Sequence, residues 1–418
     1  MVKKGYKQTE VGVIPEDWDV RKIGDFTDTT AGGTPSTSHP EYWNGEILWM
    51  SSGELNNRRI HNVIGRITEL GYNNSSTHMI PKNCVLIGLA GQGKTRGTVA
   101  VNYVKLCTNQ SIAAIFPSKE HNSEYLYQNL RSRYEELREL SSGDGGRGGL
   151  NLTIIKNFPC AFPKLQEQNR IAEALSDVDG MISSLEKLIA KYKSIKTACL
   201  QQMFPQNGET VPRMRLPGFT GAWEQRKLSE MCGTFEYGLN AAAKEFDGKN
   251  KYIRITDIDD ASREFLLSDL SSPDICLDGM SKYLLSSGDI VFARTGASVG
   301  KTYIYRENDG IVYFAGFLIR AKVNQDNDAE FVFQSTLSPS YEKYIRITSQ
   351  RSGQPGVNAQ EYSEYDLFAP SKEEQQRIGH FLRGIDNLIT LHQRKLVKVQ
   401  KIKQGMMQQL LTGKIRLV

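Results

Sequence analysis

The chain has 418 residues, 39% of them hydrophobic and 24% charged, and a formal net charge of +5. This composition is typical of a globular protein with two or three domains. Its apolar runs are too short to cross a membrane, its first residues do not lead into a signal-peptide core, and its cysteines lack zinc-ligand spacing. We therefore expect a cytoplasmic protein with reduced thiols, whose mild basic excess permits nucleic-acid binding without demonstrating it.

Residues 1–162 predict a first domain of mixed α/β type. A helical stretch is expected at 123–140, after short β-rich runs at 47–50, 84–89, 97–104 and 111–116. Within this domain, residues 88–95 read GLAGQGKT and fit the G-x-x-x-x-G-K-[ST] pattern of phosphate-binding loops in ATPases and GTPases. The match raises the hypothesis of a nucleotide-binding enzyme.

Residues 163–206 predict a long helix. Apolar residues recur there in alternating steps of four and three, at 171, 175, 178, 182, 185, 189 and 192. This spacing is typical of a coiled-coil seam, and a helix of about 40 residues would be about 60 Å long. A helix lying on a globular domain is the less favoured alternative, because globular helices are usually far shorter.

A second domain at 207–369 is predicted to be of the same mixed α/β class. Its lead-in, AWEQRKL, matches DWDVRKI near the start of the chain, but the two regions that follow diverge almost completely. A helical stretch is expected at 330–337, after β-rich runs at 252–256, 289–293, 302–305 and 310–319.

Residues 370–418 predict a second long helix that repeats the first. The stretches 163–204 and 370–411 align without a gap, and Asp179 and Lys196 of the first have identical counterparts in Asp386 and Lys403 of the second. Because each helix nearly copies the seam of the other, we expect the two to pack together as antiparallel helices in a coiled coil. The predicted fold is therefore α/β (α+β), with an internal pseudo-twofold repeat.

The second domain also argues against the NTPase hypothesis. Residues 289–305, DIVFARTGASVGKTYIY, keep a strand, a small-residue turn, Gly-Lys-Thr and a strand, but Gly296 lies only four residues before Gly300, which breaks the phosphate-loop spacing. A genuine phosphate loop also leads into a helix, whereas TRGTVAVNYV favours a strand. We predict instead a Gly-rich turn between strands, carrying basic residues and suited to close approach by another backbone.

The whole chain resembles the specificity (S) subunit of type I restriction-modification systems. The resemblance is carried by two divergent domains that are each followed by a near-identical helix, and by phrases such as EYWNGEILWMSSGEL, LPGFTGAWEQRKL, GDIVFARTGASVGKT and EQQRIGHFLRGIDNLI. It implies that residues 1–162 and 207–369 are target-recognition domains, each reading one half of a bipartite, asymmetric DNA site.

The same resemblance implies roles for the helices and the partners. The helices at 163–206 and 370–418 would set the separation of the two halves and dock two modification (methyltransferase) subunits, which recruit restriction (translocase-nuclease) subunits. The chain itself would hold no cofactor, and S-adenosylmethionine, ATP and magnesium are expected in the partner subunits. Double-stranded DNA is the expected ligand, and no membrane partner is expected.

Candidate DNA-binding residues are polar and basic side chains in Gly-rich or turn segments, because these side chains hydrogen-bond to base edges or phosphates. A plain solvated side chain is the competing interpretation of each. In the first domain they are Asn57, Arg58, Arg59, Gln92, Lys94, Arg96 and Arg147, and in the second Arg254, Arg294, Thr295, Lys301, Gln350, Arg351 and Gln354. Candidate partner-binding residues on the spacer helices are Ile171, Leu175, Ile182, Ile189, Ile378, Leu382, Ile389 and Leu396.

Two other classes of function remain open. One is an enzyme, either an NTPase through residues 88–95 or an autonomous methyltransferase, although the N/D-P-P-[YFW] motif of amino-methylation is absent. The other is a tandem scaffold that binds proteins but not DNA. No catalytic or metal-ligating residue is predicted in this chain.

Overall fold

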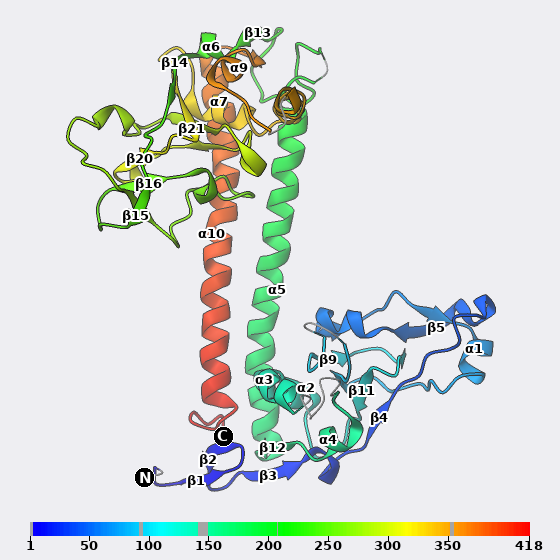
Figure 1. Ribbon diagram of the computed structural model, residues 1–418. Helices are drawn as coiled ribbons and strands as arrows, with labels where there is room; N and C mark the ends of the chain where they lie inside the picture. The colour runs from blue at the N-terminus through cyan, green and yellow to red at the C-terminus, as the bar shows by residue number, and fades with distance from the viewer. Residues whose placement is uncertain (1–2, 92–94, 141–148, 207, 352–354) are drawn as a thin grey trace. The chain divides into compact units, whose positions relative to one another are not determined.

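The computed structural model describes residues 3–91, 95–140, 149–206, 208–351 and 355–418. It consists of two compact units, Met1–Ser184 with Lys395–Val418, and Leu185–Arg394. Each unit holds one mixed α/β domain and part of both long helices, α5 (Leu165–Gln202) and α10 (Lys372–Leu410) (Figure 1). The two helices expected from the 4–3 spacing are confirmed, and they lie side by side.

The first unit is built on a five-stranded sheet in the order β4-β11-β8-β9-β6. Its three central strands, β8, β9 and β11, are buried along their whole length, which explains their short continuous apolar runs. The bounds are β4 (Thr29–Ala31), β6 (Arg59–Ile60), β8 (Val85–Gly88), β9 (Val99–Asn102) and β11 (Ile112–Ile115). Three helices follow this sheet in the chain: α2 (Ser123–Ser132), α3 (Tyr134–Glu139) and α4 (Leu152–Lys156).

Smaller elements complete the first unit. They are the hairpin β1 (Tyr6–Thr9) and β2 (Gly12–Pro15), the pair β3 (Asp19–Lys22) and β12 (Pro159–Phe162), helix α1 (Glu69–Asn73), and a sheet of β5 (Trp43–Met50), β7 (Arg66–Ile67) and β10 (Cys107–Thr108).

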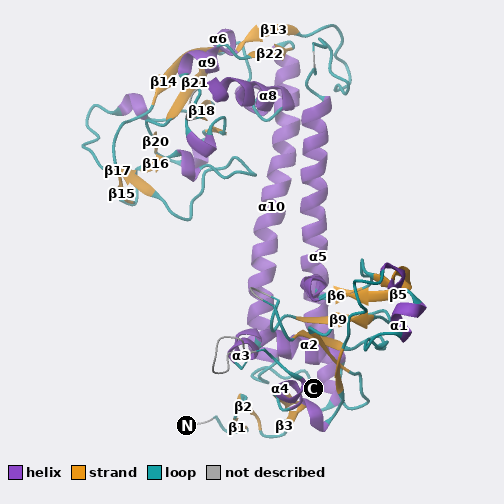
Figure 2. Cartoon of the chain, turned by 45° about the vertical axis from the view of Figure 1, so that its right-hand side comes forward, coloured by secondary structure: helices purple, strands orange, loops and turns teal. Residues whose placement is uncertain are grey.

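The second unit repeats the order of the first sheet. Its strands run β14-β21-β18-β19, which matches β4-β11-β8-β9. The bounds are β14 (Cys232–Tyr237), β18 (Asp289–Ala293), β19 (Thr302–Ile304) and β21 (Leu318–Val323), followed by α7 (Ala329–Ser335), α8 (Pro339–Thr348) and α9 (Ala359–Ser363). The two domains therefore share one strand order although their sequences diverge. Figure 2 shows the strands and helices of each unit beside the long helices α5 and α10.

The remaining elements of the second unit are paired strands and one short helix. They are β13 (Glu224–Lys227) with β22 (Asp366–Ala369), β15 (Ala243–Glu245) with β17 (Ser271–Pro273), β16 (Lys251–Ile253) with β20 (Val312–Phe314), and α6 (Leu228–Met231).

Each unit has its own apolar contact between domain and helices. In the first unit, Ile171 and Leu175 of α5 pack with Leu410 of α10 and with Trp18 of the domain. The second unit has the corresponding cluster, formed by Ile378, Leu382 and Ile389 of α10, Leu200 of α5, Phe331 of α7 and Trp223. No helix in the described part of the chain is long and apolar enough to cross a membrane.

A polar anchor accompanies the apolar contact in the first unit. The Asp179 carboxylate of α5 accepts hydrogen bonds from Lys403 Nζ of α10 at 2.6 Å and from Gln128 Nε2 of α2 at 2.8 Å. Burial would raise the pKa of Asp179, but the hydrogen bond from Lys403 and the nearby positive charges outweigh it and lower the pKa to about 2.

The second unit repeats the anchor with the helices exchanged. Asp386 of α10 accepts from Lys196 Nζ of α5 at 2.5 Å and from Gln334 Nε2 of α7 at 2.9 Å. Each aspartate thus binds the lysine contributed by the other helix, which accounts for the presence of both residues in both copies of the repeat.

Candidate nucleic-acid interface

The two Gly-rich turns join neighbouring antiparallel strands of the shared frame. β8 pairs with β9 in the first domain, and β18 pairs with β19 in the second. Residues 95–98, which follow the GLAGQGKT match, form a turn that leads into β9, so the helix that a phosphate loop requires is replaced by a strand. The predicted strand–turn–strand arrangement is confirmed.

The register corrects the expected equivalence of the two Gly-Lys-Thr stretches. The amide of Gly97 donates to the carbonyl oxygen of Gly88 at 2.9 Å, as the amide of Gly300 donates to that of Ala293 at 3.0 Å. Gly300 therefore corresponds to Gly97 in the structure, whereas aligning the two Gly-Lys-Thr sequences had matched Gly300 with Gly93. Gly97 and Gly300 have φ of +78° and +83°, a conformation that favours glycine.

In the first domain, the structure separates the predicted DNA-binding residues into exposed and engaged ones. Asn57 and Arg58 are exposed in the turn before β6, and Arg58 has φ of +62°, which is uncommon for a residue with a side chain. Arg59 is instead held by Glu124 at 2.8 Å and by Asp179 at 3.1 Å. Of these candidates, Asn57 and Arg58 are thus the exposed ones, whereas Arg96 is half-buried in the Gly-rich turn.

Two predicted residues of the second domain also have carboxylate partners. Arg254 binds Asp257 through two hydrogen bonds, Nε to Oδ2 at 2.8 Å and Nη2 to Oδ1 at 2.9 Å. Lys301 is ion-paired with the exposed Asp260. Gln350 is exposed near the end of α8, in a short 3-10 helix at Ser349–Arg351.

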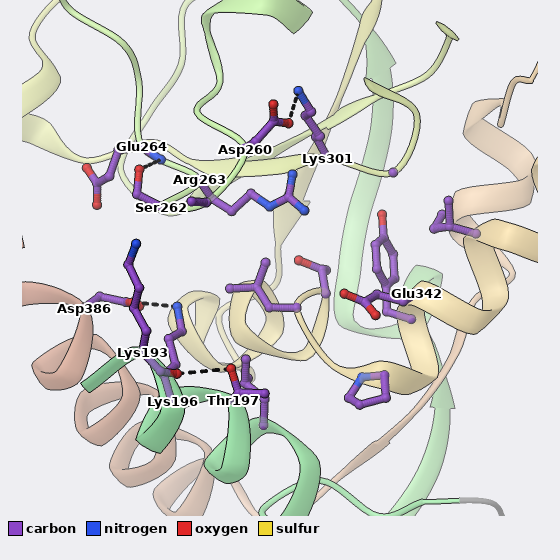
Figure 3. A pocket seen from close by; sticks show the side chains of 18 of the residues that line it. Lys193, Lys196, Thr197, Asp260, Ser262, Arg263, Glu264, Lys301, Glu342 and Asp386 are labelled. Carbon is purple, nitrogen blue, oxygen red and sulfur yellow. Dashed lines mark hydrogen bonds and ion pairs between the residues drawn. The ribbon is translucent and has the colours of Figure 1, made fainter. Parts of the chain in front are cut away.

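Lys301 lines a cavity of about 700 Å³ in the second unit, together with part of α5 (Figure 3). Lys193 and Arg263 also face this cavity, and its wall carries the Lys196–Asp386 pair described above. Part of the positive charge in the wall is therefore already balanced by carboxylates, since Lys301 is paired with Asp260 and Lys196 with Asp386.

Arg294 and Thr295 lie together at the end of β18, in a different environment. The Arg294 Cζ atom lies 5.1 Å from the ring centre of Tyr237 and 5.8 Å from that of Phe317. Its Nε atom is buried without a hydrogen-bond partner, and no carboxylate of the described residues forms an ion pair with its guanidinium. Thr295 forms an isolated antiparallel bridge with Gly356.

The sequence did not single out Tyr237 and Phe317, which the structure places beside Arg294. Tyr237 ends β14 and Phe317 precedes β21, so they come from strands far apart in the chain. The available signal was an aromatic residue next to a glycine in each case, Tyr237 before Gly238 and Phe317 after Gly316. Such pairs are too common in loops to identify a site.

Several predictions fall outside the described residues or stay untested. Gln92, Lys94, Arg147 and Gln354 lie outside the described residues, as does the side chain of Arg351. The DNA contacts of the other candidates stay predictions. In the described part of the chain, no group of three or more His, Cys, Asp or Glu side chains is placed to hold a metal ion.

The seam residues face the interior of the chain. Of these eight candidate partner-binding residues, six are buried and two are half-buried. A separate subunit would therefore mainly contact the outward-facing residues of the two helices. The role of the eight residues in docking stays a prediction. The buried ones are Ile171, Leu175, Ile189, Ile378, Leu382 and Ile389, and the half-buried ones Ile182 and Leu396.

The fold defines a protein with two mixed α/β domains on one frame, each attached to part of a shared pair of helices. The family model of the type I restriction modification DNA specificity domain matches residues 15–195 and again residues 221–401. The chain belongs to this family, and it carries two copies of the specificity domain.

One similar protein covers nearly the whole chain, and another covers less than half of it. The MjaIX type I restriction enzyme specificity subunit of Methanocaldococcus jannaschii is 25% identical over 427 residues, which is 98% of this chain and 96% of that protein. The EcoR124I/EcoR124II specificity subunit of Escherichia coli is 27% identical over 184 residues, 43% of this chain and 44% of that protein.

Among solved structures, the S subunit of the type I restriction-modification system from M. genitalium has a TM-score of 0.62 at 18% identity and covers 94% of this chain and 96% of its own. A chain from a structure of complex assembly in the type I R-M system has a TM-score of 0.53 at 14% identity, with 96% of this chain and 99% of that chain covered. At these identities the likeness concerns the fold.

Proposed function

We propose that this chain is the non-catalytic subunit that gives a type I restriction-modification complex its DNA sequence specificity. Each domain reads one half of a bipartite, asymmetric site, and the helix pair α5–α10 sets the separation of the halves. The helices dock two modification subunits, which carry the methyl-transfer chemistry with S-adenosylmethionine and recruit restriction subunits that use ATP and magnesium.

One observation carries this proposal: a single frame occurs twice with different side chains at its turns. The four strands β4-β11-β8-β9 correspond in order to β14-β21-β18-β19, yet the backbone position that Leu89 holds in the first domain is held in the second by Arg294, between two aromatic rings. A shared frame with divergent polar turns suits two readers of unlike base sequences, because base edges are read by individual side chains.

Exposed apolar side chains at matching positions of the two helices support docking of two identical partners. Met181 of α5 and Ile402 of α10 lie in the first unit, and each is 48% exposed. Their counterparts in the repeat, Leu388 and Ile195, are 37% and 36% exposed and lie in the second unit. Each unit thus presents one such residue from each helix, as expected of equivalent surfaces for two copies of one subunit.

The proposal is tested by DNA binding of the chain assembled with its modification subunits. Selection from a randomised duplex library should enrich two unlike short motifs at one fixed distance. Enrichment of no sequence would favour the scaffold alternative, and binding of ATP by the isolated chain would favour the NTPase alternative.

A further inference from the structure

We propose that Arg294, held between Tyr237 and Phe317, reads a guanine in the half-site recognised by the second domain. Recognition would use the N7 and O6 acceptors on the major-groove edge of that guanine. This inference rests on the proposed function and assigns one specific contact within it.

Two aromatic rings orient the guanidinium of Arg294, and no carboxylate in the described part of the chain is paired with it. The flanking rings lie 5.1 and 5.8 Å from Cζ, within the range of cation–π contacts, and they restrict the plane of the guanidinium. The backbone is fixed as well, because the Arg294 amide donates to the Phe317 carbonyl oxygen at 3.1 Å. Arg254 and Arg59, by contrast, already use their donors on carboxylates.

The two rings are themselves exposed, which a purely structural cluster does not need. Tyr237 is 44% exposed and Phe317 56% exposed, beside an arginine that is half-buried. The Tyr237 hydroxyl accepts a hydrogen bond from the amide of Ala359 at 3.2 Å, which fixes this ring against α9. A fixed arginine with exposed apolar neighbours can approach both the polar edge of a base pair and its apolar surroundings.

The first domain lacks this cluster at the equivalent backbone positions. The amide of Leu89 donates to the carbonyl oxygen of Ser111 at 2.8 Å, as Arg294 donates to Phe317. The register also places Ala31 where the second domain has Tyr237, because Ala31 lies opposite Ala113 and Tyr237 opposite Ile319. The cluster of Arg294, Tyr237 and Phe317 is therefore present in the second domain and not at the equivalent positions of the first. This is expected of residues that recognise only one of the two half-sites.

Arginine is suited to guanine because its planar fork of donors matches the two adjacent acceptors, N7 and O6. Among the four bases, only guanine offers two acceptors side by side on its major-groove edge. A phosphate contact would show no preference among base pairs, so the two roles can be separated by base analogues.

The experiment uses the chain assembled with its modification subunits and duplexes that carry its bipartite site. Each guanine of the second half-site is replaced in turn by 7-deazaguanine, which lacks the N7 acceptor, or by inosine, which keeps N7 and O6. For the wild-type complex, we expect one 7-deazaguanine position to weaken binding about ten-fold, and inosine at that position to have little effect.

The variant Arg294→Ala should bind the unmodified site about ten-fold more weakly and lose its sensitivity to 7-deazaguanine at that one position. Phe317→Ala should weaken the same contact, whereas Phe317→Tyr, which keeps an aromatic ring, should retain it. Arg226→Ala is the matched control, because Arg226 is an arginine of the same unit that is ion-paired with Glu224.

Three results would overturn the inference: a second half-site without guanine, an Arg294→Ala variant that keeps the 7-deazaguanine penalty, or an equal loss of affinity on every duplex. Circular dichroism and binding to the unchanged first half-site verify that each variant is folded. If the wild-type complex preferred no sequence at all, the proposed function itself would fail.

Discussion

Asp179 and Asp386 perform the same structural task at equivalent residues of the two helices. Asp179 binds Lys403, and Asp386 binds Lys196, so each ion pair joins α5 to α10 within one unit. The side chains of Asp179 and Lys403 are only 10% and 4% exposed. Removing one partner of such a pair leaves a buried charge without compensation, which costs more than the pair itself contributes.

We therefore predict that Asp179→Asn lowers the free energy of unfolding by about 2–4 kcal/mol at neutral pH. Because the pKa of Asp179 is lowered from 3.8 to about 2, the folded state binds fewer protons than the unfolded state between these values. The stability contributed by Asp179 is thus present above pH 4 and is lost as the pH falls towards 2.

Thermal and denaturant unfolding from pH 6 to pH 2 measure this difference. The wild type should lose stability in the acid range more steeply than Asp179→Asn. Asp177→Asn is the control, because Asp177 is an exposed aspartate on the same helix. Equal stability of the two variants at neutral pH would contradict the account.

Among the elements, the two Gly-rich turns show how a shared frame accepts different sequences. Gly97 and Gly300 keep the same conformation and the same backbone hydrogen bond. The number of residues between the end of the preceding strand and this glycine, however, differs between the two turns. Gly300 also lies against α8, since a Cβ atom at this position would be 2.6 Å from Cγ2 of Ile345. The turn therefore needs glycine for both its backbone conformation and its packing.

Gly300→Ala should destabilise the protein by about 2–3 kcal/mol, because it adds a clash to the cost of a positive φ. Gly296→Ala is the matched control in the same turn, with φ of +69° but open space around its Cβ position. We expect Gly296→Ala to cost about 1 kcal/mol. Denaturant unfolding of both variants tests this, and equal costs would show that packing against Ile345 is unimportant.

The helices offer a second prediction at the scale of elements. Introducing a charge into either exposed apolar site, by Met181→Glu or Leu388→Glu, should remove one of the two modification subunits from the assembled complex. The double variant should lose both. Sedimentation velocity measures the stoichiometry, with Gln376→Glu as a control because Gln376 is an exposed polar residue of α10. Retention of both subunits by the double variant would exclude this docking surface.

At the scale of the whole molecule, periodicity and repetition in the sequence predicted the two helices, the two domains and most central strands. Helix α8 was missed, although Ser338 accepts a hydrogen bond from the Tyr341 amide at its start and Pro339 follows, as is common in the first turn. The Arg294 cluster was only partly predictable, because it joins residues from three segments of a sheet whose register is not written in local sequence. The identical Gly-Lys-Thr sequences suggested a wrong equivalence because they, too, do not reveal the register of the strands.

In the proposed function, the two domains read two unlike halves of one DNA site. Mapping methylated bases across the genome of a host, with and without this chain and in the presence of its modification subunits, tests this function most directly. We expect the chain to add methylation at one motif made of two unlike halves separated by a fixed number of unspecified base pairs. Methylation at a continuous or palindromic motif, or a methylation pattern that does not depend on the chain, would contradict it.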